Sequence, residues 1–163
     1  MLLLKTIKEQ QPNSLPVWIM RQAGRHLPEY QELKKKTGSL DKMFMDPVVA
    51  TEVTLQPVTR YDMDAAVIFS DLLMIHRALG QTVSYDPLTV GTFKEEMLET
   101  DLKTFHSRLE HTYKIIKMVR SKLEPHKAVL GFVGAPYTIL KYMTKIEKPQ
   151  DLDACDRSFY LDQ

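Results

Sequence analysis

Two arginines four residues apart, Arg21 and Arg25, are the side chains of this sequence that point most directly to chemistry. They follow an apolar run over residues 17–20, and the residues between them are uncharged: Gln22, Ala23 and Gly24. An arginine stays charged at physiological pH, and its fork of N–H donors matches a carboxylate or a phosphate. The pattern predicts a buried strand that opens into a loop with an anion clamp. The alternative is two surface arginines paired with Glu29 or with aspartates.

Asp71 is the second candidate, because it ends another apolar run, residues 65–70. A buried carboxylate must be paired or hydrogen-bonded, or its pKa rises. One reading is a catalytic carboxylate beside the arginine loop. The other is a helix N-cap for residues 72–75, a task that Ser70 could share.

Tyrosines and a histidine complete the candidate set. Tyr137 and Tyr142 lie on a helix expected after the third strand, where each could reach a ligand or lie in the core with its hydroxyl satisfied. His26 adjoins the arginine loop and is kept as a candidate for anion contact. No histidine has metal-ligand spacing with another histidine or with Cys155, so no metal site is predicted.

Three apolar runs predict the buried strands that position these residues: 17–20, 65–70 and 128–133. Met20 and Phe69, near the ends of the first two runs, are expected in the core. Each run precedes a helical pattern, so β-then-α units with right-handed crossovers and a parallel sheet are expected. Ligands of such sheets bind at the carboxyl ends of the strands. The arginine loop, Asp71 and the turn at 134–136 all fall there.

Local signals mark the helices. Starts are predicted at Pro28, Ser39, Asp46-Pro47 and Pro136, with Gly38 after the end of the first and a kink or break at Pro57. Leu3, Leu4 and Ile7 suit a short N-terminal amphipathic helix. Apolar spacing predicts one long helix before Pro125, built on Leu102, Phe105, Leu109, Ile116, Val119 and Leu123. Residues 80–93 read as an irregular excursion with one or two short strands.

The composition fits one globular domain of 163 residues, 44% hydrophobic and 26% charged. A net charge of +1 excludes a global field for nucleic acid or a membrane surface. The single cysteine, Cys155, excludes an internal disulfide and a cysteine metal cage, and it favours a reducing compartment. The apolar start ends at Lys5 and is too short for a membrane span or signal segment. We expect a soluble, cytoplasmic protein.

The arginine loop also carries a family resemblance. Residues 16–25, read as PVWIMRQAGR and followed by Leu27-Pro28-Glu29-Tyr30, closely resemble the N-terminal signature of uroporphyrinogen decarboxylase. Further matches follow in order at 54–57, 64–73, 78–80 and 131–140. The resemblance covers roughly residues 3–145.

The resemblance implies a (β/α)8 TIM barrel, of which residues 1–163 would form the N-terminal, incomplete part of a single domain. It implies a carboxy-lyase of porphyrin and haem biosynthesis, usually a homodimer. The family converts uroporphyrinogen III to coproporphyrinogen III by removing carbon dioxide from four acetates, without metal or organic cofactor. By the match, Arg21 and Arg25 bind substrate carboxylates, and Gln22, Ala23 and Gly24 shape their loop. Asp71 is the central aspartate facing the pyrrole N–H groups, and Tyr142 aligns with the substrate-binding tyrosine.

The chain departs from the family in two ways. A barrel typically needs about 250 residues, so the later strands, with a Ser or Thr and a His that contact substrate, are missing. Residues 145–156 lack the Gly-rich loop of the family. We therefore expect this polypeptide alone to be unstable, aggregated or partner-dependent, and catalytically weak. The alternatives are a superfamily methyltransferase with zinc bound by His and Cys, which would lack the arginine loop, and a non-catalytic porphyrinogen-binding or dimerisation remnant.

Overall fold

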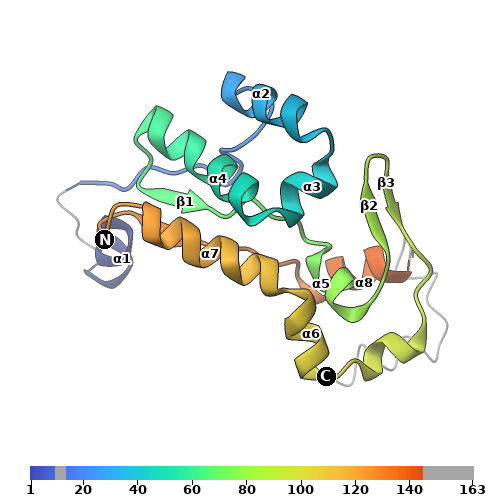
Figure 1. Cartoon of the computed structure of the whole chain (residues 1–163). Coiled ribbons are helices and arrows are strands. Elements are labelled where there is room, and N and C mark those ends of the chain that lie inside the picture. Colours follow the sequence, from blue (N-terminus) through green and yellow to red (C-terminus); the bar gives the residue numbers. More distant parts are fainter. Residues whose placement is uncertain (10–13, 145–163) are drawn as a thin grey trace.

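A computed structural model of the chain describes residues 1–9 and 14–144 (Figure 1). Its elements, in chain order, are α1 (Leu2–Glu9), α2 (Pro28–Thr37), α3 (Leu40–Met45), α4 (Pro47–Tyr61), β1 (Ala65–Val67), α5 (Met74–Leu79), β2 (Val83–Tyr85), β3 (Leu88–Val90), the 3₁₀ helix η1 (Glu95–Glu99), α6 (Leu102–Arg108), α7 (Glu110–Lys122), β4 (Ala128–Leu130) and α8 (Pro136–Thr144). The departure predicted over 145–156, with Cys155, lies outside the described residues.

Local capping chemistry sets the helix starts as predicted. The Asp46 carboxylate accepts hydrogen bonds from the backbone N–H groups of Val48 and Val49, and Ser39 accepts one from Lys42. These bonds satisfy donors that have no partner within the helix. Helix α2 begins with Pro28 and is followed by Gly38 at φ 85°, a left-handed conformation that glycine adopts without strain.

Two helix predictions are corrected. Helix α4 is not broken at Pro57 but continues to Tyr61. The single long helix is two helices that meet at Leu109 (φ −97°, ψ 3°). The bend allows α6 to pack on α5 while α7 packs on α4, which one straight helix could not do. The apolar stripe also differs, because α7 buries Ile115 and Val119 and leaves Ile116 39% exposed.

Strands β1 and β4 form a two-stranded parallel sheet in which Ala65 pairs with Ala128 and Val67 with Leu130. The excursion over 80–93 forms the antiparallel hairpin of β2 and β3, as predicted. Both parallel strands are shorter than their apolar runs, although one further bond from Ile68 N to Leu130 O (2.9 Å) continues the pairing. The β1–β4 pair confirms the parallel arrangement expected for the second and third runs.

The first apolar run is neither a strand nor buried, contrary to prediction. It touches the sheet at one point, where Asp64 N–H donates to Val17 O (2.9 Å) and Val17 N–H donates to Asp64 Oδ2 (2.7 Å). Exposure over residues 17–20 ranges from 39% for Trp18 to 77% for Met20. An apolar run indicates a tendency to be buried, but burial requires a layer on the other side.

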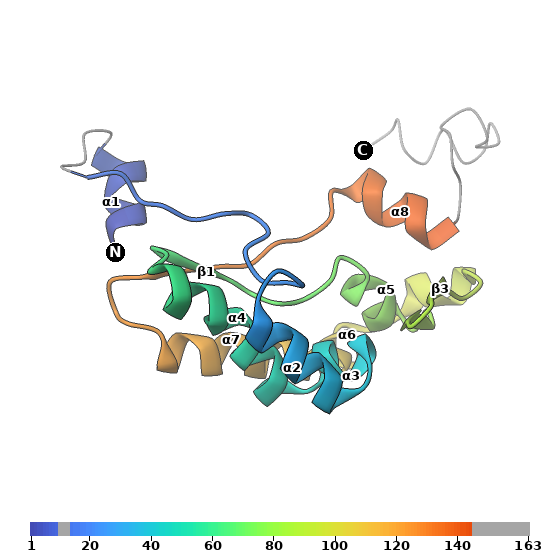
Figure 2. The same ribbon diagram turned by 90° about the horizontal axis from the view of Figure 1, so that it is seen from above.

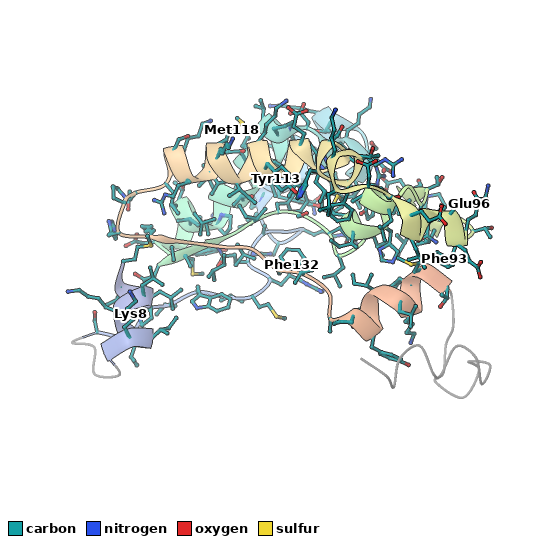
Figure 3. The ribbon with its side chains drawn as sticks, turned by 90° about the horizontal axis from the view of Figure 1, so that it is seen from below. Lys8, Phe93, Glu96, Tyr113, Met118 and Phe132 are labelled. Atoms are coloured by element: carbon teal, nitrogen blue, oxygen red, sulfur yellow. The ribbon has the colours of Figure 1, made fainter. Side chains whose placement is uncertain are left out.

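Figure 2 shows why that layer is lacking in the described part of the chain. Helices α2, α4 and α7 lie on one side of the extended segments, whereas α1 and α8 lie on the other side, one at each end. Between α1 and α8 the segments 15–20 and 131–135 carry exposed apolar side chains, among them Phe132 at 48% and Val133 at 70% (Figure 3). We call residues 15–20 and 132–133, which carry these side chains, the apolar face.

The core consists of three clusters of buried side chains. The first joins α4, β1 and α7, the second joins α3, α5 and the β2–β3 hairpin, and the third joins α2, α3 and α4 through Leu27, Tyr30, Met43 and Val53. Phe69, just after β1, packs against all three. Its ring stacks on Phe44 (4.7 Å between centroids) and meets Tyr30 edge-on (6.1 Å). Phe69 therefore lies in the core as predicted, unlike Met20.

One hydroxyl group holds the backbone at Phe69. Thr54 Oγ1 accepts a hydrogen bond from Phe69 N–H (2.9 Å) and donates one to Ala50 O (2.7 Å). Thr54 is fully buried, so water cannot readily replace its hydroxyl as the acceptor of the Phe69 N–H. A buried donor without an acceptor costs free energy, which makes this bond important to the path of the chain after β1.

We predict opposite results for two threonines of α4. Thr54→Val leaves the Phe69 N–H without its acceptor and should lower the free energy of unfolding by about 1–3 kcal/mol. Thr51 is equally buried, but its hydroxyl has no hydrogen-bond partner among the described residues. Thr51→Val should therefore be neutral or stabilising. Urea unfolding followed by circular dichroism compares the two, and equal losses would contradict the role given to Thr54.

Candidate active site

The arginine loop is held in place by a buried amide between its two cations. Gln22 is 3% exposed. Its Nε2 donates to Ala65 O in β1 (2.9 Å), and its Oε1 accepts from Ile19 N–H (3.2 Å). The side chains of Arg21 and Arg25 are exposed. Gln22 thus points into the fold and fixes the loop to β1.

The second anchor of the loop is Leu27, which is fully buried in the third cluster. Leu27 N–H donates to Gly24 O (3.1 Å), and this closes a tight turn at Gly24, whose φ is +152°. Residues with a side chain rarely adopt that backbone conformation, which explains the glycine at position 24. Ala23 packs against the same cluster. Gln22 and Leu27 therefore clamp both ends of a short loop that displays Arg25.

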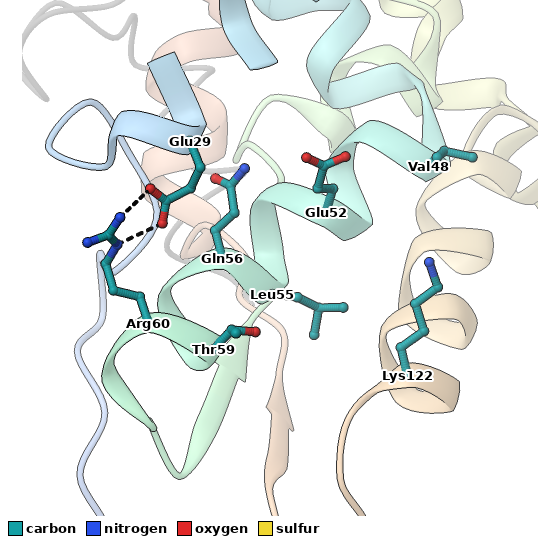
Figure 4. Close-up of a pocket in the computed structure, with 8 residues that line it drawn as sticks. All are labelled: Glu29, Val48, Glu52, Leu55, Gln56, Thr59, Arg60 and Lys122. Carbon is teal, nitrogen blue, oxygen red and sulfur yellow. Dashed lines mark hydrogen bonds and ion pairs between the residues drawn. The ribbon is translucent and has the colours of Figure 1, made fainter. Parts of the chain in front are cut away.

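The alternative pairing of the loop arginines with Glu29 does not occur. Glu29 is held instead by Arg60 of α4 through two hydrogen bonds of 2.8 Å each (Figure 4). These bonds from Arg60 lower the pKa of Glu29 from 4.5 to about 2. Among residues 1–9 and 14–144, no side chain pairs with the guanidinium group of Arg21 or Arg25. Both cations are available to an external anion.

Asp71 is half-buried in the turn between β1 and α5. Its Oδ1 accepts hydrogen bonds from Leu73 N–H (2.8 Å) and from the Tyr85 hydroxyl (3.2 Å). Helix α5 begins at Met74 rather than at Leu72, so Asp71 caps the turn that precedes the helix. Oδ2 has no hydrogen-bond partner in the part of the chain that the structure describes. The capping reading thus accounts for one carboxylate oxygen and leaves the other available.

Helix α8 carries both candidate tyrosines on its outside. Tyr137 is 50% and Tyr142 is 43% exposed. Two buried side chains attach the helix to its neighbours: His76 Nε2 donates to Ile139 O (2.9 Å) and Gln81 Nε2 donates to Met143 O (2.9 Å). Burial lowers the pKa of His76, which favours the neutral form of its ring. The structure fixes α8 but does not choose between the tyrosines.

The predicted site residues are attached to the β1–β4 pair at different points. Gln22 ties the arginine loop to Ala65, the first residue of β1, whereas Asp71 follows the carboxyl end of β1 and α8 follows its partner β4. No hydrogen bond or ion pair links Arg21 or Arg25 to Asp71 or Tyr142 among the described residues. His26 stacks on Tyr61 (6.4 Å between centroids) and is exposed. Sequence reasoning missed Tyr85, Arg60 and His76, whose partners lie far away in the chain.

A groove of about 640 Å³ lies elsewhere, on the outer side of α4 between α2 and α7 (Figure 4). It contains none of the predicted site residues, and its walls are formed by Glu29, Val48, Glu52, Leu55, Gln56, Thr59, Arg60 and Lys122. The described residues contain no group of three or more His, Cys, Asp or Glu side chains placed to bind a metal. None of the described helices has the length and hydrophobicity needed to cross a membrane.

Comparisons with known proteins agree on one family. The family model described as "Uroporphyrinogen decarboxylase (URO-D)" matches residues 1–155. Curated uroporphyrinogen decarboxylases from Erythrobacter litoralis and Rickettsia felis are 38% and 40% identical over 99% and 91% of this chain, but the matches cover 48% and 44% of their own lengths. The chain therefore spans about half the length of these relatives.

A solved structure supports the fold class. A methyltransferase from Methanosarcina mazei superposes with a TM-score of 0.63 over 87% of this chain and 44% of its own, at 17% identity. At that identity the likeness concerns the fold alone. Together with the family match it confirms the predicted α/β class of (β/α)8 TIM barrels.

We predict that the Glu29 carboxyl group titrates at a pKa of about 2, because its charged form accepts two hydrogen bonds from Arg60. Arg60→Gln should return this pKa towards 4.5, and Arg25→Gln should leave it unchanged. In the unmodified chain the pair stabilises the fold above pH 4.5, and this contribution is lost as the pH falls towards 2. Carbon-13 NMR of the glutamate carboxyl groups measures both variants; a shift in Arg25→Gln alone would contradict the pairing.

Proposed function

Because this chain belongs to the uroporphyrinogen decarboxylase family, we propose that it takes part in converting uroporphyrinogen III to coproporphyrinogen III, as a carboxy-lyase of porphyrin and haem biosynthesis. The reaction removes carbon dioxide from four acetate side chains. The family match over residues 1–155 supports this activity, and the site geometry supports the roles of individual residues.

The observation that carries the proposal is the pair of exposed guanidinium groups on an anchored loop, neither of which pairs with a side chain of the described residues. Arg21 and Arg25 flank the buried Gln22, and the candidate partner Glu29 is occupied by Arg60. The substrate bears acetate and propionate carboxylates. Two fixed cations suit such a substrate, since hydrogen bonds between charged partners are stronger than neutral ones.

Asp71 supplies the electrostatic part of the mechanism. Loss of carbon dioxide from an acetate leaves an electron pair that needs an acceptor. Protonation of a pyrrole carbon provides one, because the ring becomes cationic, and the electrons of the broken C–C bond then neutralise the ring and leave an exocyclic methylene group. A second proton converts this methylene to the methyl group, and loss of the first proton from the ring carbon restores the pyrrole. A carboxylate already in position stabilises such a cation as it forms. The oxygen Oδ2 of Asp71, which lacks a partner among the described residues, can also accept pyrrole N–H bonds.

We further propose that residues 1–163 form the N-terminal part of one barrel domain, and that the apolar face packs against further β/α units. The high exposure of Met20 and Val133 supports this arrangement, since patches of this kind mark interaction surfaces. The partner that we propose for this face is the remaining half of such a barrel, because about half of each relative lies outside the match. Tyr142 as a substrate contact, the homodimer and a cytoplasmic location remain predictions.

Substitutions in the loop and at Asp71 test the catalytic assignment. We expect Arg21→Ala to weaken uroporphyrinogen III binding by about tenfold or more, through loss of a charge-assisted bond. Asp71→Gly should lower turnover by about 10²–10³-fold. Lys114→Ala, which removes an exposed cation paired with Glu110 on α7, should leave both unchanged.

The measurements are anaerobic binding and coproporphyrinogen formation, for this chain alone and mixed with the part of the E. litoralis relative that lies beyond the match. Unimpaired turnover in both Arg21→Ala and Asp71→Gly would refute the assigned roles. Absence of binding and turnover in the unmodified chain under both conditions would refute the function.

The apolar face gives a separate prediction. The chain alone should bind a hydrophobic dye, and mixing it with that same part of the relative should suppress the dye signal and yield a one-to-one complex. Met20→Asp should weaken the complex by about tenfold or more, because it buries a charge. Leu98→Asp, at a 57% exposed position of η1, is the control. Equal complex formation by both variants would show that another surface is used.

A further inference from the structure

The hydroxyl group of Tyr85 reaches the candidate catalytic carboxylate from outside the strands of the parallel sheet. Tyr85 is the last residue of β2, in the hairpin that the sequence presents as an irregular excursion. Its hydroxyl donates to Asp71 Oδ1 at 3.2 Å, across 14 positions of sequence. Tyr85 is 8% exposed and Asp71 is half-buried, so this contact is partly buried.

An ion pair holds Tyr85 from the opposite side. Asp41 of α3 accepts a hydrogen bond from Tyr85 N–H at Oδ2 (2.9 Å) and pairs through Oδ1 with Arg77 of α5. The Arg77 guanidinium lies over the Tyr85 ring, 5.4 Å from its centroid. Phe44 packs against the same ring at 4.8 Å. Contacts with α3 and α5 thus fix the Tyr85 ring independently of the bond from its hydroxyl to Asp71.

The Tyr85 hydroxyl remains protonated. Burial, with Asp71 nearby, raises the pKa of Tyr85 far above its usual value of 10. The hydroxyl therefore stays a donor wherever the protein is folded, and the carboxylate can only accept from it. With Leu73 N–H as second donor, Oδ1 of Asp71 receives two hydrogen bonds.

We propose that Tyr85 is a positioning residue for Asp71: it holds the carboxylate through Oδ1 in one orientation and so keeps Oδ2 for the N–H groups of the substrate. The geometry stands by itself, and only the last clause rests on the proposed function. The proposal gives the β2–β3 hairpin a role, which is to bring a hydroxyl group to the end of β1.

The test compares two tyrosines that each lose only a hydroxyl. Tyr85→Phe removes the donor to Asp71. Tyr113→Phe removes a hydroxyl from the same apolar cluster, one that bonds His106 Nδ1 at 2.6 Å. Three-bond Hα–Hβ couplings of Asp71, assigned with Asp71→Asn, report its side-chain orientation in the free protein. Binding of uroporphyrinogen III without oxygen reports the effect on the substrate.

We expect Tyr85→Phe to average the Asp71 couplings over several rotamers and to weaken porphyrinogen binding by about tenfold. Tyr113→Phe should leave both as in the unmodified chain. Unchanged couplings in Tyr85→Phe would overturn the proposal, since Leu73 N–H alone would then suffice. If the unmodified chain binds no porphyrinogen, the proposed function fails, while the couplings still decide the role of Tyr85.

Discussion

The contacts of Phe69 connect the core of the protein with the chain that leaves β1. Its ring joins the three core clusters, and its backbone N–H is bound by the Thr54 hydroxyl. The chain leaves β1 at this point and turns towards Asp71 two residues later. The distance between the candidate carboxylate and the helices that surround it is therefore set in the core. The position of Asp71 thus depends on the packing of Phe69 in the core.

Features that depend on neighbouring residues could be predicted from the sequence. The Asp46 and Ser39 caps follow from side chains that satisfy backbone groups two or three residues away, and the Gly38 stop follows from the ease with which glycine adopts a left-handed conformation. The parallel strands at 65–67 and 128–130 follow from continuous apolar runs. The position of Asp71 after the first of these strands was predicted for the same reason.

Features that depend on distant partners could not be predicted. Nothing near Tyr85 in the sequence indicates that it meets Asp71, and nothing near Arg60 indicates that it takes Glu29. The exposure of Met20 shows the same limit, because an apolar side chain is buried only where another layer covers it. The chain bends at Leu109 because α6 packs on α5 whereas α7 packs on α4. The spacing of apolar residues does not indicate which helix each part will pack against.

The Arg60–Glu29 pair has a consequence for selectivity. Glu29 lies four residues after Arg25, and an unpaired carboxylate there would act as an internal competitor for the loop cations. By holding that carboxylate on the outer side of α4, Arg60 removes a ligand that is always present at high local concentration. The loop can then discriminate among free anions by their own affinity. If the loop binds anions as proposed, Arg60 therefore influences its selectivity without belonging to the loop.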